Sequence, residues 1–319
     1  MFIFKILLLI LGFVLLIKGA DIFVDGASAI ATRLKIPKMM IGLTIVAFGT
    51  SAPEFAVSVK SMMSGNGDMM LGNVIGSNVL NIGLILGLTA VIRKIRVKSE
   101  VVKKELPIMV LMTLAFVALI ADRVFNVEAT NGLTRQDGVI LVLMFGIFIY
   151  HLISMAKRGG KEPKFNKKTI SWWMASGMTF GGILGIVFGS DLVVNSASEL
   201  AIMIGVSQKM VALTVIALGT SLPELVTSVM AARKGESDIA IGNVVGSNIF
   251  NIAVVAGLPV IMFGGIPKVT FSYIDIIAML LIAVLLYIVA KTNHRIGRLE
   301  GLMFLGLFIA YYSYVVMMI

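Results

Sequence analysis

The chain has 319 residues, of which 58% are hydrophobic and only 14% are charged. An average soluble domain is about one quarter charged, so this composition excludes an ordinary soluble globular protein. The net charge is +10, but the basic residues lie in short segments between apolar runs, which is typical of membrane topology and not of nucleic-acid binding. There is no cysteine, which excludes disulfides, thiolate metal sites and cysteine nucleophiles.

Apolar runs long enough to cross a hydrocarbon core of about 30 Å as helices recur along the whole chain. The first run continues through Asp21 and Asp25 and lacks a small-residue cleavage site, so we interpret it as a membrane helix and not as a signal peptide. We therefore expect an all-α integral membrane protein with ten transmembrane helices. The predicted spans are residues 2–31, 37–63, 69–91, 105–121, 137–156, 171–200, 207–232, 239–263, 272–290 and 299–317.

The loops on the two sides of these spans differ in their basic residues. Twenty Lys and Arg residues fall on one side and six on the other, while Lys18 lies inside the first span. Cytoplasmic loops are enriched in Lys and Arg, so the richer side is predicted to be cytoplasmic. This predicts a multi-pass protein of the cell membrane with both termini outside the cytoplasm.

The two halves of the sequence repeat one another. Shifted by 170 residues, Met40–Leu88 matches Met210–Leu258 at 23 of 49 positions without a gap. Equivalent points are five helices apart, and because five is odd, the second copy must cross the membrane in the opposite direction. We expect two inverted five-helix repeats, residues 1–157 and 171–319, joined by a cytoplasmic linker at 158–170. Such repeats are typical of secondary transporters, and a duplicated scaffold without transport is the alternative.

Each repeat carries a glutamate in the middle of an apolar span. Residues 47–54 read A-F-G-T-S-A-P-E, and residues 217–224 read A-L-G-T-S-L-P-E. An ionisable side chain at the centre of a membrane helix costs about 2.5 to 3.5 kcal/mol on insertion scales. No basic residue lies nearby in either span, so a cation from solution or a proton is the expected partner of Glu54 and Glu224.

Helical spacing places oxygen atoms beside each glutamate. Positions i, i+3, i+4 and i+7 share a helix face, so the Ala47 backbone and the side chains of Thr50, Ser51 and Glu54 are expected to lie together. Their counterparts are positions 217, 220, 221 and 224. A proline in a helix interior breaks or kinks it, so Pro53 and its counterpart should leave carbonyl oxygens free for an ion. A proline-kinked packing helix is the alternative.

The next predicted helix of each repeat carries a polar stripe. Residues 72–81 read G-N-V-I-G-S-N-V-L-N, and residues 242–251 read G-N-V-V-G-S-N-I-F-N. Ser77, Asn81, Ser247 and Asn251 are candidates to complete an oxygen-rich cage. The other asparagines of these motifs are at least as well explained by interhelical hydrogen bonds, and Asp68 and Asp238 are expected to cap the two helices.

All the candidate ligands are oxygens, which favours calcium, sodium or magnesium over zinc or copper. The residues resemble the cation/calcium exchanger superfamily, specifically its sodium/calcium exchanger branch, whose paired alpha repeats read G-T-S-x-P-E and G-N-x-x-G-S-N. Both motifs occur twice here, in an alpha-1 motif at 40–88 and an alpha-2 motif at 210–258, and the resemblance covers nearly the whole chain.

By that resemblance, the first and sixth helices would slide across the core, and the alanines would bind ions through their carbonyls. The sodium and calcium sites would be lined by Ala47, Thr50, Ser51, Glu54, Ser77, Asn81, Ala217, Thr220, Ser221, Glu224 and Ser247. We add Asn251 to this set, although several exchangers of the branch carry aspartate there. With asparagine at both 81 and 251, the fixed charge is about minus two, enough for one calcium or two sodium ions. The stoichiometry and any potassium dependence stay open.

The leading hypothesis is a secondary antiporter that exchanges calcium for sodium by alternating access and exports calcium. A calcium/proton exchanger and a passive cation channel are the alternatives. We expect no enzyme, because paired catalytic aspartates and the H-E-x-x-H and G-x-S-x-G motifs are lacking. We expect no cofactor; the partners are the transported calcium and sodium ions and membrane lipid. One chain carries the whole predicted site, so a monomer is sufficient for it.

Overall fold

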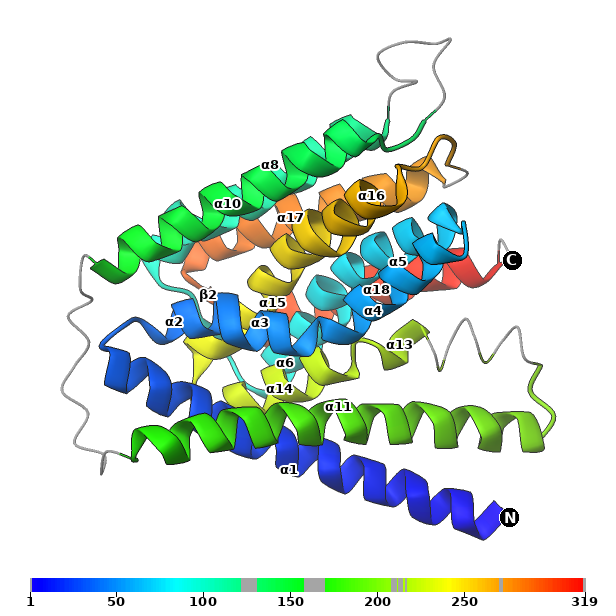
Figure 1. Cartoon of the computed structure of the whole chain (residues 1–319). Helices are drawn as coiled ribbons and strands as arrows, with labels where there is room; N and C mark the ends of the chain where they lie inside the picture. The colour runs from blue at the N-terminus through cyan, green and yellow to red at the C-terminus, as the bar shows by residue number, and fades with distance from the viewer. Residues whose placement is uncertain are drawn as a thin grey trace.

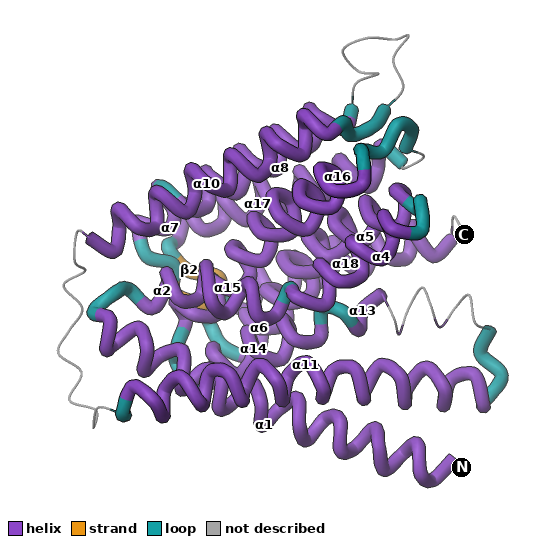
Figure 2. Tube along the Cα trace, in the orientation of Figure 1, coloured by secondary structure: helices purple, strands orange, loops and turns teal. Residues whose placement is uncertain are grey.

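The computed structural model describes residues 2–121, 131–157, 170–207, 211, 215, 217–269 and 272–317, and nearly all of them are helical (Figure 2). The first half contains α1 (Phe2–Leu34), α2 (Lys38–Ile41), η1 (Gly42–Val46), α3 (Ala47–Thr50), α4 (Ala52–Met63), α5 (Gly67–Leu80), η2 (Asn81–Leu86), α6 (Gly87–Ile92), α7 (Ser99–Lys103), α8 (Glu105–Ile120) and α10 (Arg135–Lys157). The second half contains α11 (Trp172–Met203), α13 (Ala217–Gly219), α14 (Leu222–Arg233), α15 (Ser237–Phe250), η4 (Asn251–Ala256), α16 (Gly257–Phe263), α17 (Tyr273–Asn293) and α18 (Arg298–Met317). The elements η1, η2 and η4 are π-helical turns.

Several of these helices are long and apolar enough to cross a membrane. Among the described residues there are seven such helices, and an eighth if Lys38–Thr50 and Ala52–Met63 form one bent span. The helix α8 has only 16 residues, and the predicted span at 207–232 falls partly outside the described residues. The prediction of an all-helical multi-span protein is confirmed, whereas the count of ten stays a prediction. Except for Ile170, the predicted linker also lies outside the described residues.

Two of the candidate membrane spans lie at the centre of the molecule, and the other spans lie around them. In the most apolar 18-residue window, 72% of Gly67–Ile92 and 83% of Ser237–Phe263 is buried, against 17% in α1, α10 and α18. In Figure 1 the α1–α11 pair and the α8–α10 pair lie on opposite sides of the central helices. A long helix that exposes apolar side chains is suited to lipid, so the outer helices shield the two central ones.

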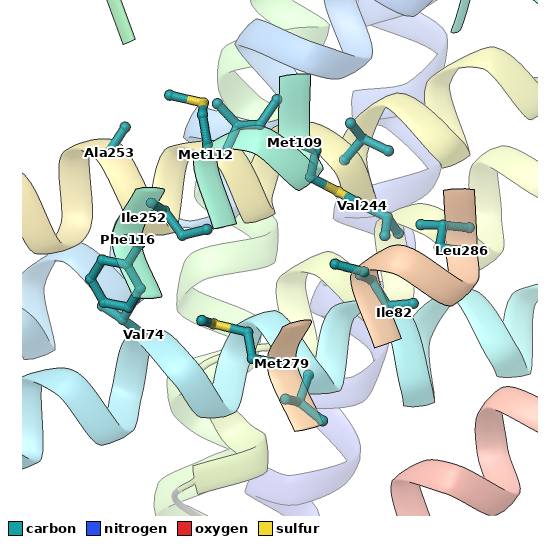
Figure 3. Packing of buried hydrophobic residues seen from close by; sticks show 14 of the residues in the cluster. Val74, Ile82, Met109, Met112, Phe116, Val244, Ile252, Ala253, Met279 and Leu286 are labelled. Carbon is teal, nitrogen blue, oxygen red and sulfur yellow. The ribbon is translucent and has the colours of Figure 1, made fainter. Parts of the chain in front are cut away.

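A continuous apolar core holds the central spans against α8 and α17. Figure 3 shows Val74 of α5, Phe116 of α8, Ile252 of η4 and Met279 of α17 converging on one cluster. All four side chains are buried. This packing fixes α5 and η4, which belong to different halves of the chain, relative to each other.

The longest helices, α1 and α11, pack along their length with glycines at the interface. On α1 the glycines at 12, 19 and 26 are spaced by seven residues. A Cβ atom at Gly182 would lie 2.7 Å from the backbone of Phe23, and one at Gly189 would lie 2.5 Å from the backbone nitrogen of Leu16. Small residues allow close backbone approach, which drives helix association in membranes, so α1 and α11 form one rigid pair.

Replacing Gly189 with alanine should therefore destabilise the protein, by about 1–3 kcal/mol, because overpacking a close interface forces the backbones apart. The matched control is Gly181→Ala on the same helix, where a Cβ atom would meet nothing within 4 Å. That change should leave stability unchanged or raise it by up to about 1 kcal/mol, since alanine is the better helix former. Thermal unfolding of the purified protein in detergent measures both. Equal effects would argue against close α1–α11 packing.

Ion pairs fasten α1 and α2 to the turn between α14 and α15. Lys234 Nζ lies 2.8 Å from Asp21 Oδ1 and 2.8 Å from Asp25 Oδ1, both on α1. At the start of α2, Lys38 Nζ lies 2.6 Å from Glu236 Oε1. At this end of the molecule, α1 and α2 are therefore joined to the second half by ion pairs as well as by packing.

Two local features differ from the sequence-based expectation. The helix α5 is capped by Asn66, whose side chain accepts a hydrogen bond from the N–H of Met69 (3.0 Å), so the predicted cap at Asp68 is wrong. The predicted cap at Asp238 is wrong as well, because Glu236 occupies the cap position of α15 and Asp238 lies inside the first turn, where it pairs with Lys98 (2.5 Å). A short antiparallel pair of strands, β1 (Ile95–Arg96) and β2 (Arg295–Ile296), was not expected, because two residues are too few to show an alternating pattern.

Candidate ion site

Both glutamate motifs lie at a break between two helices. In the first half, α3 ends at Thr50, Ser51 leaves helical geometry with φ −84° and ψ 8°, and the helices on either side meet at 47°. In the second half, Ser221 has φ −94° and ψ 7° between α13 and α14. Proline then occupies the first turn of α4 and of α14, where its missing N–H costs nothing. The predicted break is confirmed, and residues 47–54 do not form one uninterrupted helix.

Each serine at a break reaches the glutamate of the other half. Ser51 Oγ donates a hydrogen bond to Glu224 Oε1 (2.7 Å), and Ser221 Oγ donates one to Glu54 Oε1 (2.9 Å). All four side chains are buried. Residues about 170 positions apart in sequence thus form one reciprocal cluster, and the two carboxylates belong to a single site.

The asparagine motifs of both halves lie next to this cluster. Asn81 and Asn251 are the first residues of the π-helical turns η2 and η4, and such turns often mark functional sites. Asn251 Nδ2 donates to Ser77 Oγ (2.9 Å), and Asn81 Nδ2 donates to Asn248 Oδ1 (3.0 Å). The helix α4 packs against η4 and α14 packs against η2, so each glutamate helix contacts the asparagine turn of the opposite half.

Five buried oxygen atoms of the predicted set have no hydrogen-bond partner. They are Oε2 of Glu54, Oε2 of Glu224, Oδ1 of Asn81, Oδ1 of Asn251 and Oγ of Ser247. A buried polar atom without a partner costs about 1–3 kcal/mol, and more when it is charged. Carboxylate, amide and hydroxyl oxygens are the ligands that hard cations such as calcium prefer. The residues present therefore fit a bound cation.

The two glutamates are the only acidic contribution to this cluster within the described part of the chain. Neither forms an ion pair with a described basic residue. No group of three His, Cys, Asp or Glu side chains is assembled among the described residues. A cation here would be held by two carboxylates together with neutral oxygens.

Most of the predicted ligands are buried: Ala47, Thr50, Ser51, Glu54, Ser77, Asn81, Ser221, Glu224, Ser247 and Asn251. Thr220 is partly exposed, and Ala217 begins α13 with its side chain outside the described residues. The family resemblance implies that the Ala47 carbonyl binds an ion, and in the structure this carbonyl accepts a hydrogen bond from the N–H of Ser51 (3.0 Å). Its second lone pair is what an ion would use.

The sequence analysis left Asn73 and Asn243 open, and the structure gives them defined contacts. Asn73 Nδ2 donates to the Glu54 carbonyl and to Ser58 Oγ, both at 3.0 Å. Asn243 Nδ2 donates to the corresponding carbonyl of Glu224 (3.3 Å) and to Ser228 Oγ (2.9 Å). Ser58 and Ser228 occupy equivalent positions in the two repeats. This recurrence is the feature of the sequence that could have indicated their hydrogen bonds to the asparagines.

A third buried carboxylate lies outside the site. Glu105 at the start of α8 is buried, and its Oε1 lies 3.2 Å from Nε2 of His151 on α10. Its other oxygen has no partner. The sequence analysis missed this pair because the two residues are 46 positions apart in segments without a repeated motif.

Comparisons with known proteins identify similar chains along nearly the whole sequence. The family described as "Sodium/calcium exchanger protein" matches residues 4–154 and 174–317. The chain is 38% identical over 316 residues to the "Putative antiporter CaxA" of Alkalimonas amylolytica, with 95% of each chain covered. It is 30% identical over 337 residues to the "Sodium/calcium exchanger MaX1" of Methanosarcina acetivorans, with 96% of each covered. Among solved structures, it superposes on the sodium-calcium exchanger NCX_Mj soaked with 10 mM Na+ and zero Ca2+, with a TM-score of 0.84, 32% identity and coverage of 98% of this chain and 99% of that one.

Proposed function

Because the chain belongs to the sodium/calcium exchanger family, we propose that it exchanges calcium for sodium by alternating access and exports calcium. A membrane cation/calcium exchanger is a transporter and not an enzyme. The observation that carries the proposal is the reciprocal pair of hydrogen bonds that joins Glu54 and Glu224 in one buried site. The unpartnered oxygens around that pair are the supporting observation.

Coupling follows from competition for the two carboxylates. One calcium ion or two sodium ions balance their charge, so the site holds either species but not both. An empty site would carry two uncompensated charges through a low-dielectric interior, which is strongly unfavourable. Exchange is therefore faster than uncoupled return, and the α1–α11 pair is the unit that slides to expose the site to either face.

The same proposal includes ten spans in two inverted repeats, residues 1–157 and 171–319, with a cytoplasmic linker at 158–170 and both termini outside. Paired elements of equal length support it: α4 and α14 have 12 residues each, α5 and α15 have 14, and η2 and η4 have six. The ratio of twenty to six basic residues between the two sides supports the orientation.

A proton could replace sodium as the counter-ion, since each buried carboxylate can be neutralised by either. A passive channel is disfavoured by the buried site and by the lack of a carbonyl filter motif such as T-V-G-Y-G. A flux experiment must therefore determine the counter-ion and the direction of calcium transport separately.

Sodium-loaded proteoliposomes containing the protein should take up calcium when sodium is diluted outside, and uptake should stop when sodium is equal on both sides. Potassium and proton gradients imposed alone, in matched vesicles, are the controls. Uptake that follows only a proton gradient would replace sodium by a proton in the proposal. Calcium movement into vesicles that contain no exchanging ion would indicate a channel.

A further inference from the structure

The side chain of Asn243 bridges the two halves of the site. It is fully buried on α15, and its Nδ2 donates to Ser228 Oγ and to the Glu224 carbonyl. A carbonyl only accepts hydrogen bonds, so these contacts fix the orientation of the amide. Its Oδ1 must then face Thr50 of the first half, whose Oγ1 lies 3.1 Å away.

This contact is one of several to which the Thr50 hydroxyl can donate its single proton. Its acceptors include Val46 O at 3.1 Å, Ala47 O at 3.4 Å and Asn243 Oδ1 at 3.1 Å, and the Glu224 carboxylate also interacts with it. A cation that binds both the Thr50 hydroxyl and the Ala47 carbonyl is repelled by a proton lying between those oxygens. Donation to Asn243 removes the proton from that position and leaves lone pairs of both oxygens for the ion.

The repeat-related contact has not formed. Asn73 donates hydrogen bonds to the Glu54 carbonyl and to Ser58 Oγ, both in its own half, as Asn243 does to the equivalent atoms of the second half. Within the described part of the chain, however, no hydrogen bond joins Asn73 to Thr220, and both residues are partly exposed. The two halves therefore differ in the contact across the site.

Glycine packing brings α15 close to the first half of the chain. A Cβ atom at Gly242 would lie 3.0 Å from Gly42 Cα, and one at Gly246 would lie 2.8 Å from Leu43 Cα. The α15 end of the site is thus closed, by packing and by the ion pairs at Lys234 and Glu236.

We propose that Asn243 and Asn73 are positioning residues that each orient the threonine hydroxyl of the opposite half when their own end of the site is closed. The Asn243–Thr50 bond prepares the site for ions that enter from the face bearing the α4–α5 turn. In the opposite state it is replaced by an Asn73–Thr220 bond, which prepares the site for ions from the face bearing the α14–α15 turn. This inference rests on the proposed function, because it concerns ion binding during alternation.

Sided transport kinetics test the proposal. Asn243→Ala should raise the KM for calcium by roughly two- to tenfold, the range expected from one lost hydrogen bond, at the α4–α5 face only. Asn73→Ala should do so at the α14–α15 face only. Calcium uptake is measured in right-side-out and inverted membrane vesicles, which expose opposite faces. A KM that rises equally at both faces in both variants would overturn the proposal, because that is the result of a purely structural role.

Matched controls separate the cross-site contact from the support within each half. Ser228→Ala and Ser58→Ala remove a hydrogen bond to the asparagine of the same half and leave the threonine contact in place, so neither should have a sided effect. If the Asn243→Ala variant does not insert into the membrane, the Asn73→Ala variant alone tests the proposal. Failure of the proposed function would look different, since wild-type vesicles would then show no sodium-dependent calcium uptake.

A double-substitution cycle tests the link to Thr50 directly. Thr50→Val removes the hydroxyl that Asn243 orients, so adding Asn243→Ala to it should raise KM at the α4–α5 face no further. Full additivity of the two changes in the logarithm of KM would contradict the proposal.

Discussion

Replacing Glu54 or Glu224 with glutamine should abolish sodium-driven calcium uptake. Glutamine keeps the size of the side chain and one acceptor oxygen, but it removes one of the two charges that balance a divalent ion. Removing one partner from a buried charge pair costs about 3–5 kcal/mol, which lowers calcium affinity by about 100-fold or more. Proteoliposome uptake and calcium binding to the purified protein measure the two consequences separately.

The chain offers a matched control in Glu105. Its burial equals that of the site glutamates, and it too has one oxygen without a partner, but its contact is His151 on a different side of the core. Glu105→Gln should therefore retain sodium-driven uptake. An active Glu54→Gln/Glu224→Gln double variant would show that these carboxylates are not the ion site.

The sequence was sufficient to predict that Glu54 and Glu224 meet. A repeat offset of 170 residues, an apolar setting and no basic partner left few other arrangements, and the proline-associated break followed from backbone chemistry alone. The crossed contacts were not predictable. Helical periodicity relates residues a few positions apart, whereas the Ser51–Glu224 bond spans 173 positions and depends on how two broken helices approach each other.

The asparagines show the same limit. Spacing places Asn73 and Asn243 on the polar stripe, but the same spacing serves a ligand and an interhelical hydrogen bond equally well. Only the burial of Asn243 and its distance to Thr50 distinguish the two residues. Sequence repeats predict equal roles for both halves, while a structure in one conformation shows the two halves in unequal environments.

Replacing Asn251 with aspartate should convert an electroneutral exchanger into one that moves charge. With two carboxylates the site balances one calcium or two sodium ions, so we expect no net charge per cycle in the wild type. Ser77 lies 2.9 Å from Asn251 Nδ2, and its hydroxyl can donate to an aspartate instead, so the new charge fits without repacking. A third carboxylate supports a third sodium ion, and each net charge is worth about 2.3 kcal/mol per 100 mV.

That energy corresponds to roughly a 50-fold change in the calcium gradient that 100 mV can sustain, at about 1.4 kcal/mol per tenfold. Calcium uptake under an imposed membrane potential should therefore be insensitive to voltage in the wild type and strongly sensitive in the variant. Asn81→Asp, the repeat-related change, should have a similar effect, because Asn81 Oδ1 is equally unpartnered. Asn66→Asp adds the same charge at the exposed cap of α5 and should change nothing. Voltage-insensitive uptake in both site variants would mean that these asparagines do not contact the transported ions, and that the two glutamates alone set the charge of the cycle.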